Sequence, residues 1–113
     1  MDDLYLEMQD KKRQLYSAIN RLRELGTLKS SAKKNYHVRY TQMWLVERAK
    51  GRAIGELENT LKGFEEIAEL LQIRENLEAE YDVCQEMINA LKIDVKTIEN
   101  QLNREFGYEG KQL

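Results

Sequence analysis

Residues Leu77 to Leu102 read LEAEYDVCQEMINALKIDVKTIENQL and carry the clearest structural pattern of the chain. Its apolar residues recur at alternating steps of four and three, a mean period of about 3.5 residues that is typical of helices packed along one seam. No glycine or proline interrupts residues 64–106, so we predict one long, coiled-coil-like helix over that range. The predicted seam consists of Leu77, Tyr81, Cys84, Ile88, Leu91, Val95, Ile98 and Leu102.

Two shorter helices are predicted toward the N-terminus. Residues 3–25 carry apolar side chains at helical spacing and stop at Gly26, a residue suited to the left-handed end of a helix. Residues 31–50 begin at a pair of serines, of which Ser30 or Ser31 can cap the helix, and they stop at Gly51. Because the connection between these helices is short, the pattern predicts an antiparallel helical hairpin.

Composition agrees with an all-helical chain. The 113 residues suit one domain, residues 1–113, and they include no proline and only 6 glycines. Charged residues make up 34% of the chain, but the periodic apolar 42% argues against disorder. Residues 51–63 are left open between a short helix and the start of the long one. Residues 107–113 are predicted to be a flexible tail.

The predicted helix lengths do not match, and this suggests self-association. Residues 64–106 would span about 60 Å, whereas each shorter helix would span about 30–35 Å. One hairpin would then leave part of the seam open to water, which proteins rarely tolerate. We therefore expect a homo-oligomer, most simply a dimer. The alternative is that the seam, with Cys84 as a small buried apolar residue, is the core of a three-helix bundle within one chain.

The sequence offers little for catalysis, metal binding or a membrane. One cysteine and one histidine cannot form an intrachain disulfide or a cluster of soft metal ligands. No phosphate-binding glycine loop and no nucleophile with a base is recognisable, so we expect a non-enzyme with no cofactor and no catalytic residues. The acidic start and the lack of an apolar run of about 18 residues predict a cytoplasmic protein without a membrane partner.

Charge is unevenly distributed, although the net charge is only −2. Residues 29–52 hold seven bases against one acid, a net charge of +6, whereas residues 53–113 hold six bases against fourteen acids, a net charge of −8. Such a basic middle can pair with acidic parts of its own chain, pair chains in an oligomer, or bind an anionic partner.

The basic middle also carries aromatic residues on one sector of the predicted second helix. Bases beside tyrosine and tryptophan suit phosphate pairing and base stacking, as single-stranded nucleic acid or a nucleotide requires. The alternative is structural, with buried rings and bases that extend to the surface or pair with the acidic long helix. The candidate face consists of Lys33, Lys34, His37, Tyr40, Trp44, Arg48 and Arg52.

Residues Leu61–Arg104 resemble small helical proteins from the early regions of bacteriophages and prophages of Gram-positive bacteria. The shared motifs are a KG-x-E-x-(I/V)-A start, an R-x-x-x-E step and E-x-I-x-A-L-K. Here they fall on Lys62-Gly63, Glu65 or Glu66, Ile67-Ala68, Arg74 with Glu78, and Glu86 to Lys92. The resemblance implies a phage context, in which some such proteins assist recombination and others block host nucleases or defence systems. It assigns no functional residue.

These observations favour a non-enzymatic, oligomeric helical interaction protein that binds a host or phage macromolecule as an inhibitor or accessory factor. The expected partners are a second copy of the chain and a host or phage protein. One alternative is a nucleic-acid or nucleotide binder that uses the basic-aromatic face. The other is a coiled-coil spacer, for which surface changes would have no effect on binding.

Overall fold

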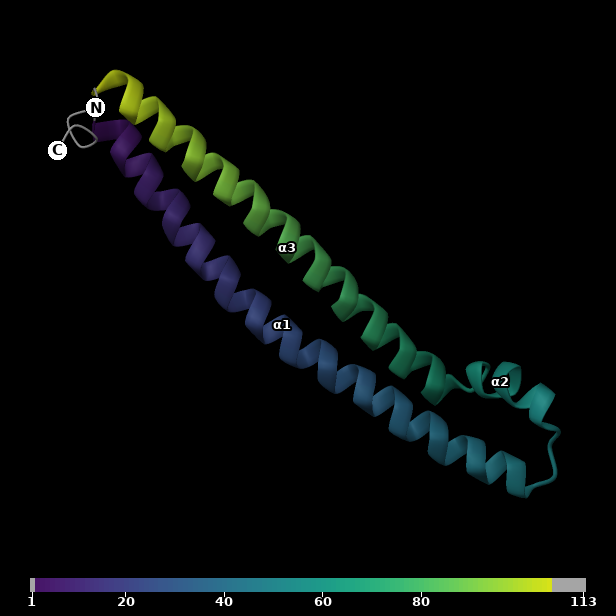
Figure 1. The fold of residues 1–113 in the computed structure, drawn as a ribbon. Helices are drawn as coiled ribbons and strands as arrows, with labels where there is room; N and C mark the ends of the chain where they lie inside the picture. The colour runs from purple at the N-terminus through teal and green to yellow at the C-terminus, as the bar shows by residue number, and fades with distance from the viewer. Residues whose placement is uncertain (1, 107–113) are drawn as a thin grey trace. The chain divides into compact units, whose positions relative to one another are not determined.

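The computed structural model describes residues 2–106 and is built from three helices (Figure 1). These are α1 (Asp2–Ala49), α2 (Ile54–Lys62) and α3 (Glu65–Glu105). Within the described residues there is no strand, which confirms the all-α prediction. The predicted tail, residues 107–113, lies outside them.

The predicted hairpin is wrong, because residues 3–25 and 31–49, with the connection between them, belong to the single helix α1. The reason lies in the face that α1 buries. Leu25 and Ala32, seven residues apart, are 2% and 7% exposed, so the buried stripe continues through Gly26 without a change of phase. A glycine inside a helix costs only about 1 kcal/mol relative to alanine. Burial of a continuous stripe outweighs that cost, and the helix does not turn.

The long helix predicted over residues 64–106 is confirmed, with α3 covering Glu65–Glu105. The predicted mismatch in helix length is wrong, because α1 has 48 residues and α3 has 41. The expectation that one chain must leave part of the α3 seam uncovered therefore loses its basis.

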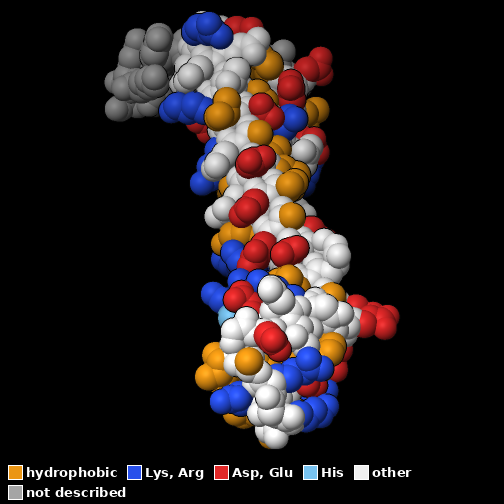
Figure 2. Space-filling model, turned by 90° about the vertical axis from the view of Figure 1, so that its right-hand side faces the viewer, with side chains coloured by type: hydrophobic (Ala, Val, Ile, Leu, Met, Phe, Trp, Pro, Cys, Tyr) orange, Lys and Arg blue, Asp and Glu red, His pale blue; other side chains and the backbone are white. Residues whose placement is uncertain are grey.

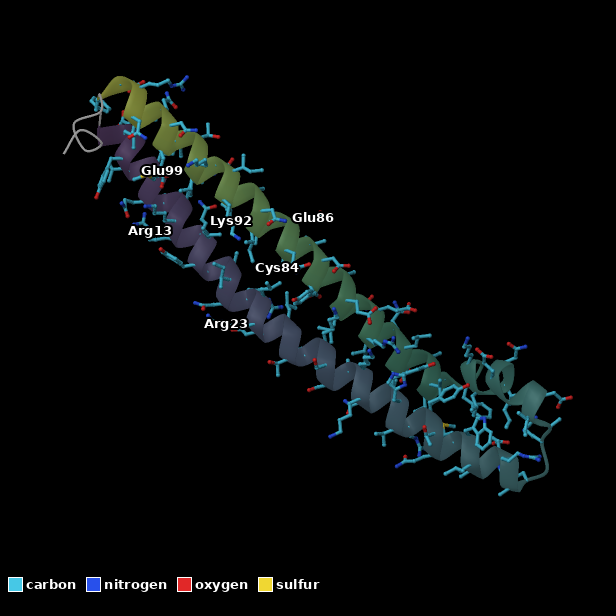
Figure 3. The ribbon with its side chains drawn as sticks, viewed as in Figure 1. Arg13, Arg23, Cys84, Glu86, Lys92 and Glu99 are labelled. Atoms are coloured by element: carbon cyan, nitrogen blue, oxygen red, sulfur yellow. The ribbon has the colours of Figure 1, made fainter. Side chains whose placement is uncertain are left out.

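The chain divides into two compact units. The terminal unit holds residues 1–23 and 82–113, and the central unit holds residues 24–81. In the terminal unit the first part of α1 and the last part of α3 run antiparallel, side by side (Figure 1). Cys84 extends from α3 toward α1 (Figure 3), where its Sγ lies 3.4 Å from the carbonyl oxygen of Ala18 and donates a weak hydrogen bond.

The central unit is the part of the chain that contains three helical segments. Residues 51–63, which the sequence left undecided, contain a separate helix, α2. Its Leu57 and Leu61 are fully buried, as is Ile67 of α3. Gly51 turns the chain after α1 with a φ of 93°, a conformation that side-chain-bearing residues rarely adopt. Gly63 follows α2, and its N–H donates to the carbonyl oxygen of Thr60.

Candidate functional site

The seam predicted on α3 is covered within the chain. Cys84, Ile88, Leu91 and Ile98 are buried in the terminal unit, and Val95 and Leu102 of the same unit are half-buried. Leu77 and Tyr81 are half-buried in the central unit, where the Tyr81 ring lies beneath Nζ of Lys29 at 4.4 Å. These side chains pack within the chain, as the alternative expected, but in the terminal unit they lie between two helices, α1 and α3, and not in a three-helix bundle.

The basic-aromatic face is divided by the structure into an exposed part and a packed part. Lys33, Lys34 and His37 of α1 are exposed, and neither lysine forms an ion pair with another described residue. Tyr40 and Trp44 are half-buried. The predicted residues therefore do not form one continuous surface of alternating bases and rings.

The aromatic rings of α1 pack inside the central unit. Tyr36 is buried, and its ring centroid is 5.7 Å from that of Tyr40. The guanidinium of Arg74 lies 5.5 Å from the ring centroid of Tyr36. Burial, and then the nearby carboxylate of Glu58, raises the pKa of Tyr40. Packing in the central unit therefore accounts for Tyr40 of the predicted face.

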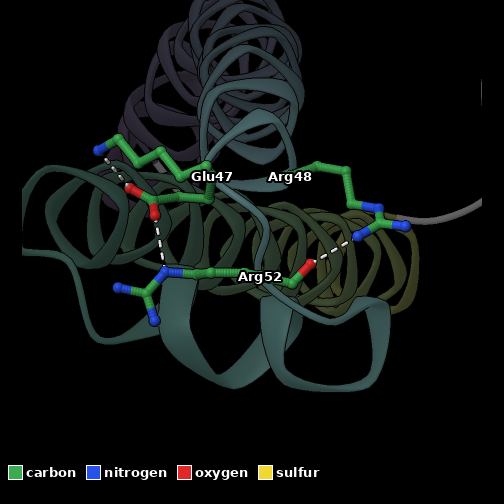
Figure 4. A network of polar contacts seen from close by, with 4 residues as sticks. Glu47, Arg48 and Arg52 are labelled. Atoms are coloured by element: carbon green, nitrogen blue, oxygen red, sulfur yellow. Dashed lines mark hydrogen bonds and ion pairs between the residues drawn. The ribbon is translucent and has the colours of Figure 1, made fainter.

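Two other predicted residues, Arg48 and Arg52, hold the turn that follows α1 (Figure 4). Nε of Arg52 donates to the buried carboxylate of Glu47 at 2.7 Å, and Nζ of Lys50 donates to it at 3.2 Å. Arg48 donates to the carbonyl oxygen of Arg52 at 2.8 Å. The hydrogen bond from Arg52 is the main cause of the lowered pKa of Glu47. Arg52 therefore has a structural partner, whereas the exposed Arg48 keeps further N–H groups for a ligand.

A second ion pair links α1 to α3 in the central unit. Arg39 donates through Nε and one terminal nitrogen to both carboxylate oxygens of Glu66, at 2.6 Å and 3.0 Å. This forked geometry is the strong form of the arginine–carboxylate pair. It raises the pKa of Arg39 and lowers that of Glu66. Part of the basic middle is thus neutralised by the acidic helix, as one reading of the charge pattern proposed.

The outer side of α1 in the central unit carries aliphatic residues among its bases. Val38 is 47% exposed and Leu45 is 59% exposed. At 100° per residue they fall, with three exposed neighbours, in a sector of about 80°. We call this sector the basic outer surface, and its residues are Lys34, Val38, Thr41, Leu45 and Arg48.

The central unit has a second surface feature on α3, an acidic groove. It is a shallow, open groove of about 370 Å³. Its aliphatic Ile73 is 50% exposed, and its two carboxylates form no ion pair with another described residue. The groove is lined by Glu65, Ala68, Glu69, Gln72 and Ile73. This groove was not predicted from the sequence. Its signal there is Ile73, an apolar residue that falls outside the predicted seam.

The terminal unit has grooves of its own beside the packed seam. The larger, of about 580 Å³, has an apolar floor that includes Met87 and Leu91, flanked by Arg13 and Arg21 of α1. Nearby, Nζ of Lys11 pairs with Asp94 at 3.6 Å. Figure 2 shows a face of the molecule on which acidic and hydrophobic side chains are exposed next to one another. Exposed aliphatic residues thus occur in both units.

Some kinds of site are not found among the described residues. No group of three or more His, Cys, Asp or Glu is placed to hold a metal ion in residues 2–106. No described helix is long and apolar enough to cross a membrane.

Comparisons with known proteins add no relative to this description. No protein-family model, no curated protein and no solved structure matches the chain.

Proposed function

We propose that this chain is a helical interaction protein that acts without catalysis, by binding a partner macromolecule through exposed helix faces. The observation that carries the proposal is the basic outer surface, where Val38 and Leu45 are about half exposed between Lys34 and Arg48. A helix that already buries one face usually presents a polar opposite face. Exposed aliphatic residues at helical spacing, flanked by charges, are the features with which a helix binds a protein groove.

Binding of single-stranded nucleic acid or a nucleotide is the second candidate. The exposed Lys33, Lys34 and His37 favour it, because unpaired bases on one helix can contact successive phosphates. It has less support, since the rings of Tyr40 and Trp44 are half-buried and the residues exposed among the bases are aliphatic. An aliphatic side chain gains more from a protein groove than from a phosphate backbone.

The resemblance of residues Leu61–Arg104 to phage early proteins supplies a setting for the proposal. In it the chain is a phage-encoded cytoplasmic protein that acts as an inhibitor or accessory factor by covering a surface of a host or phage macromolecule. A third class, the helical spacer, predicts that no change on the basic outer surface alters binding.

Site-specific photo-cross-linking in living cells tests the proposal. A benzophenone side chain replaces Leu45, and the matched control carries it at Val46, which is 54% exposed but lies about 100° away around α1. A discrete adduct with a polypeptide from position 45, and not from position 46, is the expected result. Equal labelling from both positions, or none from either, would contradict the proposal and favour the spacer.

A salt-titrated binding assay with a single-stranded oligonucleotide distinguishes the second candidate, nucleic-acid binding, from binding of a protein partner. Phosphate contacts give an affinity that falls steeply with salt and with Lys33→Glu, whereas a packed protein interface gives a shallower dependence. Arg52 has to stay in place in this assay, because its removal would leave the buried Glu47 without its closest partner.

A further inference from the structure

The central unit carries two surfaces of opposite charge, and both have exposed aliphatic residues. The basic outer surface offers Val38 and Leu45, with Lys34 and Arg48 at its two ends. The acidic groove offers Ile73, with Glu65 and Glu69 among its lining residues. Each surface therefore presents the charge and the exposed aliphatic side chains that the other surface would bind.

We propose that the basic outer surface of one copy of this chain docks on the acidic groove of a second copy. Leu45 and Val38 then cover Ile73 and Ala68, while Lys34 and Arg48 approach the carboxylates of the groove. The inference deepens the proposed function by naming a partner for the same surface, and it rests on that function.

Charge complementarity selects a second copy over an unrelated partner. Residues 29–52 have a net charge of +6, and residues 53–113 have a net charge of −8. After the internal ion pairs of Arg39 and Arg52 are formed, the first range still has an excess of positive charge and the second an excess of negative charge. Opposite charges around an apolar contact set register and speed association, while like charges exclude wrong pairings. A self-complementary chain carries both halves of this arrangement in every copy.

The positions of the two surfaces indicate a head-to-tail contact. The basic outer surface lies about 180° around α1 from the buried Ala32 and Tyr36, whereas the acidic groove is lined by α3 residues alone. A contact between two different surfaces leaves one of each free on every pair, so further copies can add. The assembly therefore grows with concentration, and it weakens as salt screens the charges.

The test uses charge reversal on the full chain, followed by sedimentation or light scattering over about a hundredfold range of concentration. One variant, Glu65→Lys with Glu69→Lys, makes both surfaces basic. The other, Lys34→Glu with Thr41→Glu, makes both largely acidic and leaves the turn contact of Arg48 untouched. Each variant alone is expected to stay monomeric, and an equimolar mixture of the two is expected to recover the mass of the unmodified chain. Glu75→Lys with Glu86→Lys, at exposed positions outside the groove, is the charge-matched control and keeps self-association.

Each outcome decides the proposal. A monomeric unmodified chain at every concentration, or self-association that neither reversal weakens, overturns it. So does a mixture that fails to recover mass although circular dichroism shows both variants folded. These failures leave the proposed function standing if cross-linking from Leu45 still captures a different polypeptide. The absence of any cross-link at Leu45 is the failure of the proposed function itself.

Discussion

Nε of Arg52 donates a hydrogen bond to the carboxylate of Glu47 at 2.7 Å and so closes the turn in which the chain leaves α1. Glu47 is the buried charged residue of α1, and Lys50 donates to the same carboxylate at 3.2 Å. Two cations on one buried carboxylate satisfy a group that would otherwise destabilise the fold. The pair explains why a residue predicted to contact nucleic acid is held against its own helix.

The Glu47–Arg52 pair predicts a pH dependence of stability. In the folded chain the hydrogen bond lowers the pKa of Glu47 below its usual value of 4.5, so the unfolded chain binds the proton more readily. The stabilising contribution is thus present above about pH 4.5 and is lost as the pH falls through the lower folded value. Unfolding midpoints of the unmodified chain and of Glu47→Gln, measured between about pH 3 and about pH 7, should differ most near neutrality and converge in acid. A constant difference across the range would show that the charge of Glu47 contributes nothing.

Gly26→Ala distinguishes the continuous α1 from a hairpin. A methyl group at this position would meet Cε2 of Tyr81 at 3.7 Å, an ordinary contact, in the interior of a helix. The free energy of unfolding should rise by about 0.5–1 kcal/mol, because alanine is the better helix former. Chemical denaturation measures the change. A loss of similar size would indicate a left-handed residue at Gly26 and a break in the helix.

Gly51 and Gly55 form a matched pair for testing the turn after α1. No atom lies within 4 Å of a methyl group added at either position, but only Gly51 has a positive φ, of 93°. Gly51→Ala should lower the free energy of unfolding by about 1–2 kcal/mol through backbone strain alone. Gly55→Ala, within α2, should raise it by about 0.5–1 kcal/mol. Shifts of the same sign in both variants would contradict this description of the turn.

Leu61 tests whether α2 completes a core in the central unit. Its side chain is fully buried, so Leu61→Ala should lower the free energy of unfolding by about 2–5 kcal/mol. The control is Leu45→Ala, because Leu45 is 59% exposed and its truncation should change stability by about 0.5 kcal/mol or less. Comparable effects of the two truncations, measured by denaturant titration on dilute protein, would mean that α2 is not packed as described.

The helical class, the α3 helix and the turn at Gly51 follow from the amino-acid sequence alone. The seam from Leu77 to Leu102 repeats without interruption, and no proline or glycine competes with it, so local preference and apolar periodicity agree. Gly51 was readable as a stop because its position coincides with the end of the helical pattern.

In contrast, the place of Gly26 inside a helix and the cover of α3 by its own chain depend on tertiary packing. A glycine permits a helix end but does not require one, and the choice depends on whether the buried stripe from Leu25 to Ala32 finds a surface to pack on. The pairing of Arg52 could not be predicted for a similar reason. A basic residue on a helix can bind a ligand or its own chain, and the difference lies in where the buried carboxylate of Glu47 is placed. Periodicity reports which residues share a face, but packing decides what covers that face.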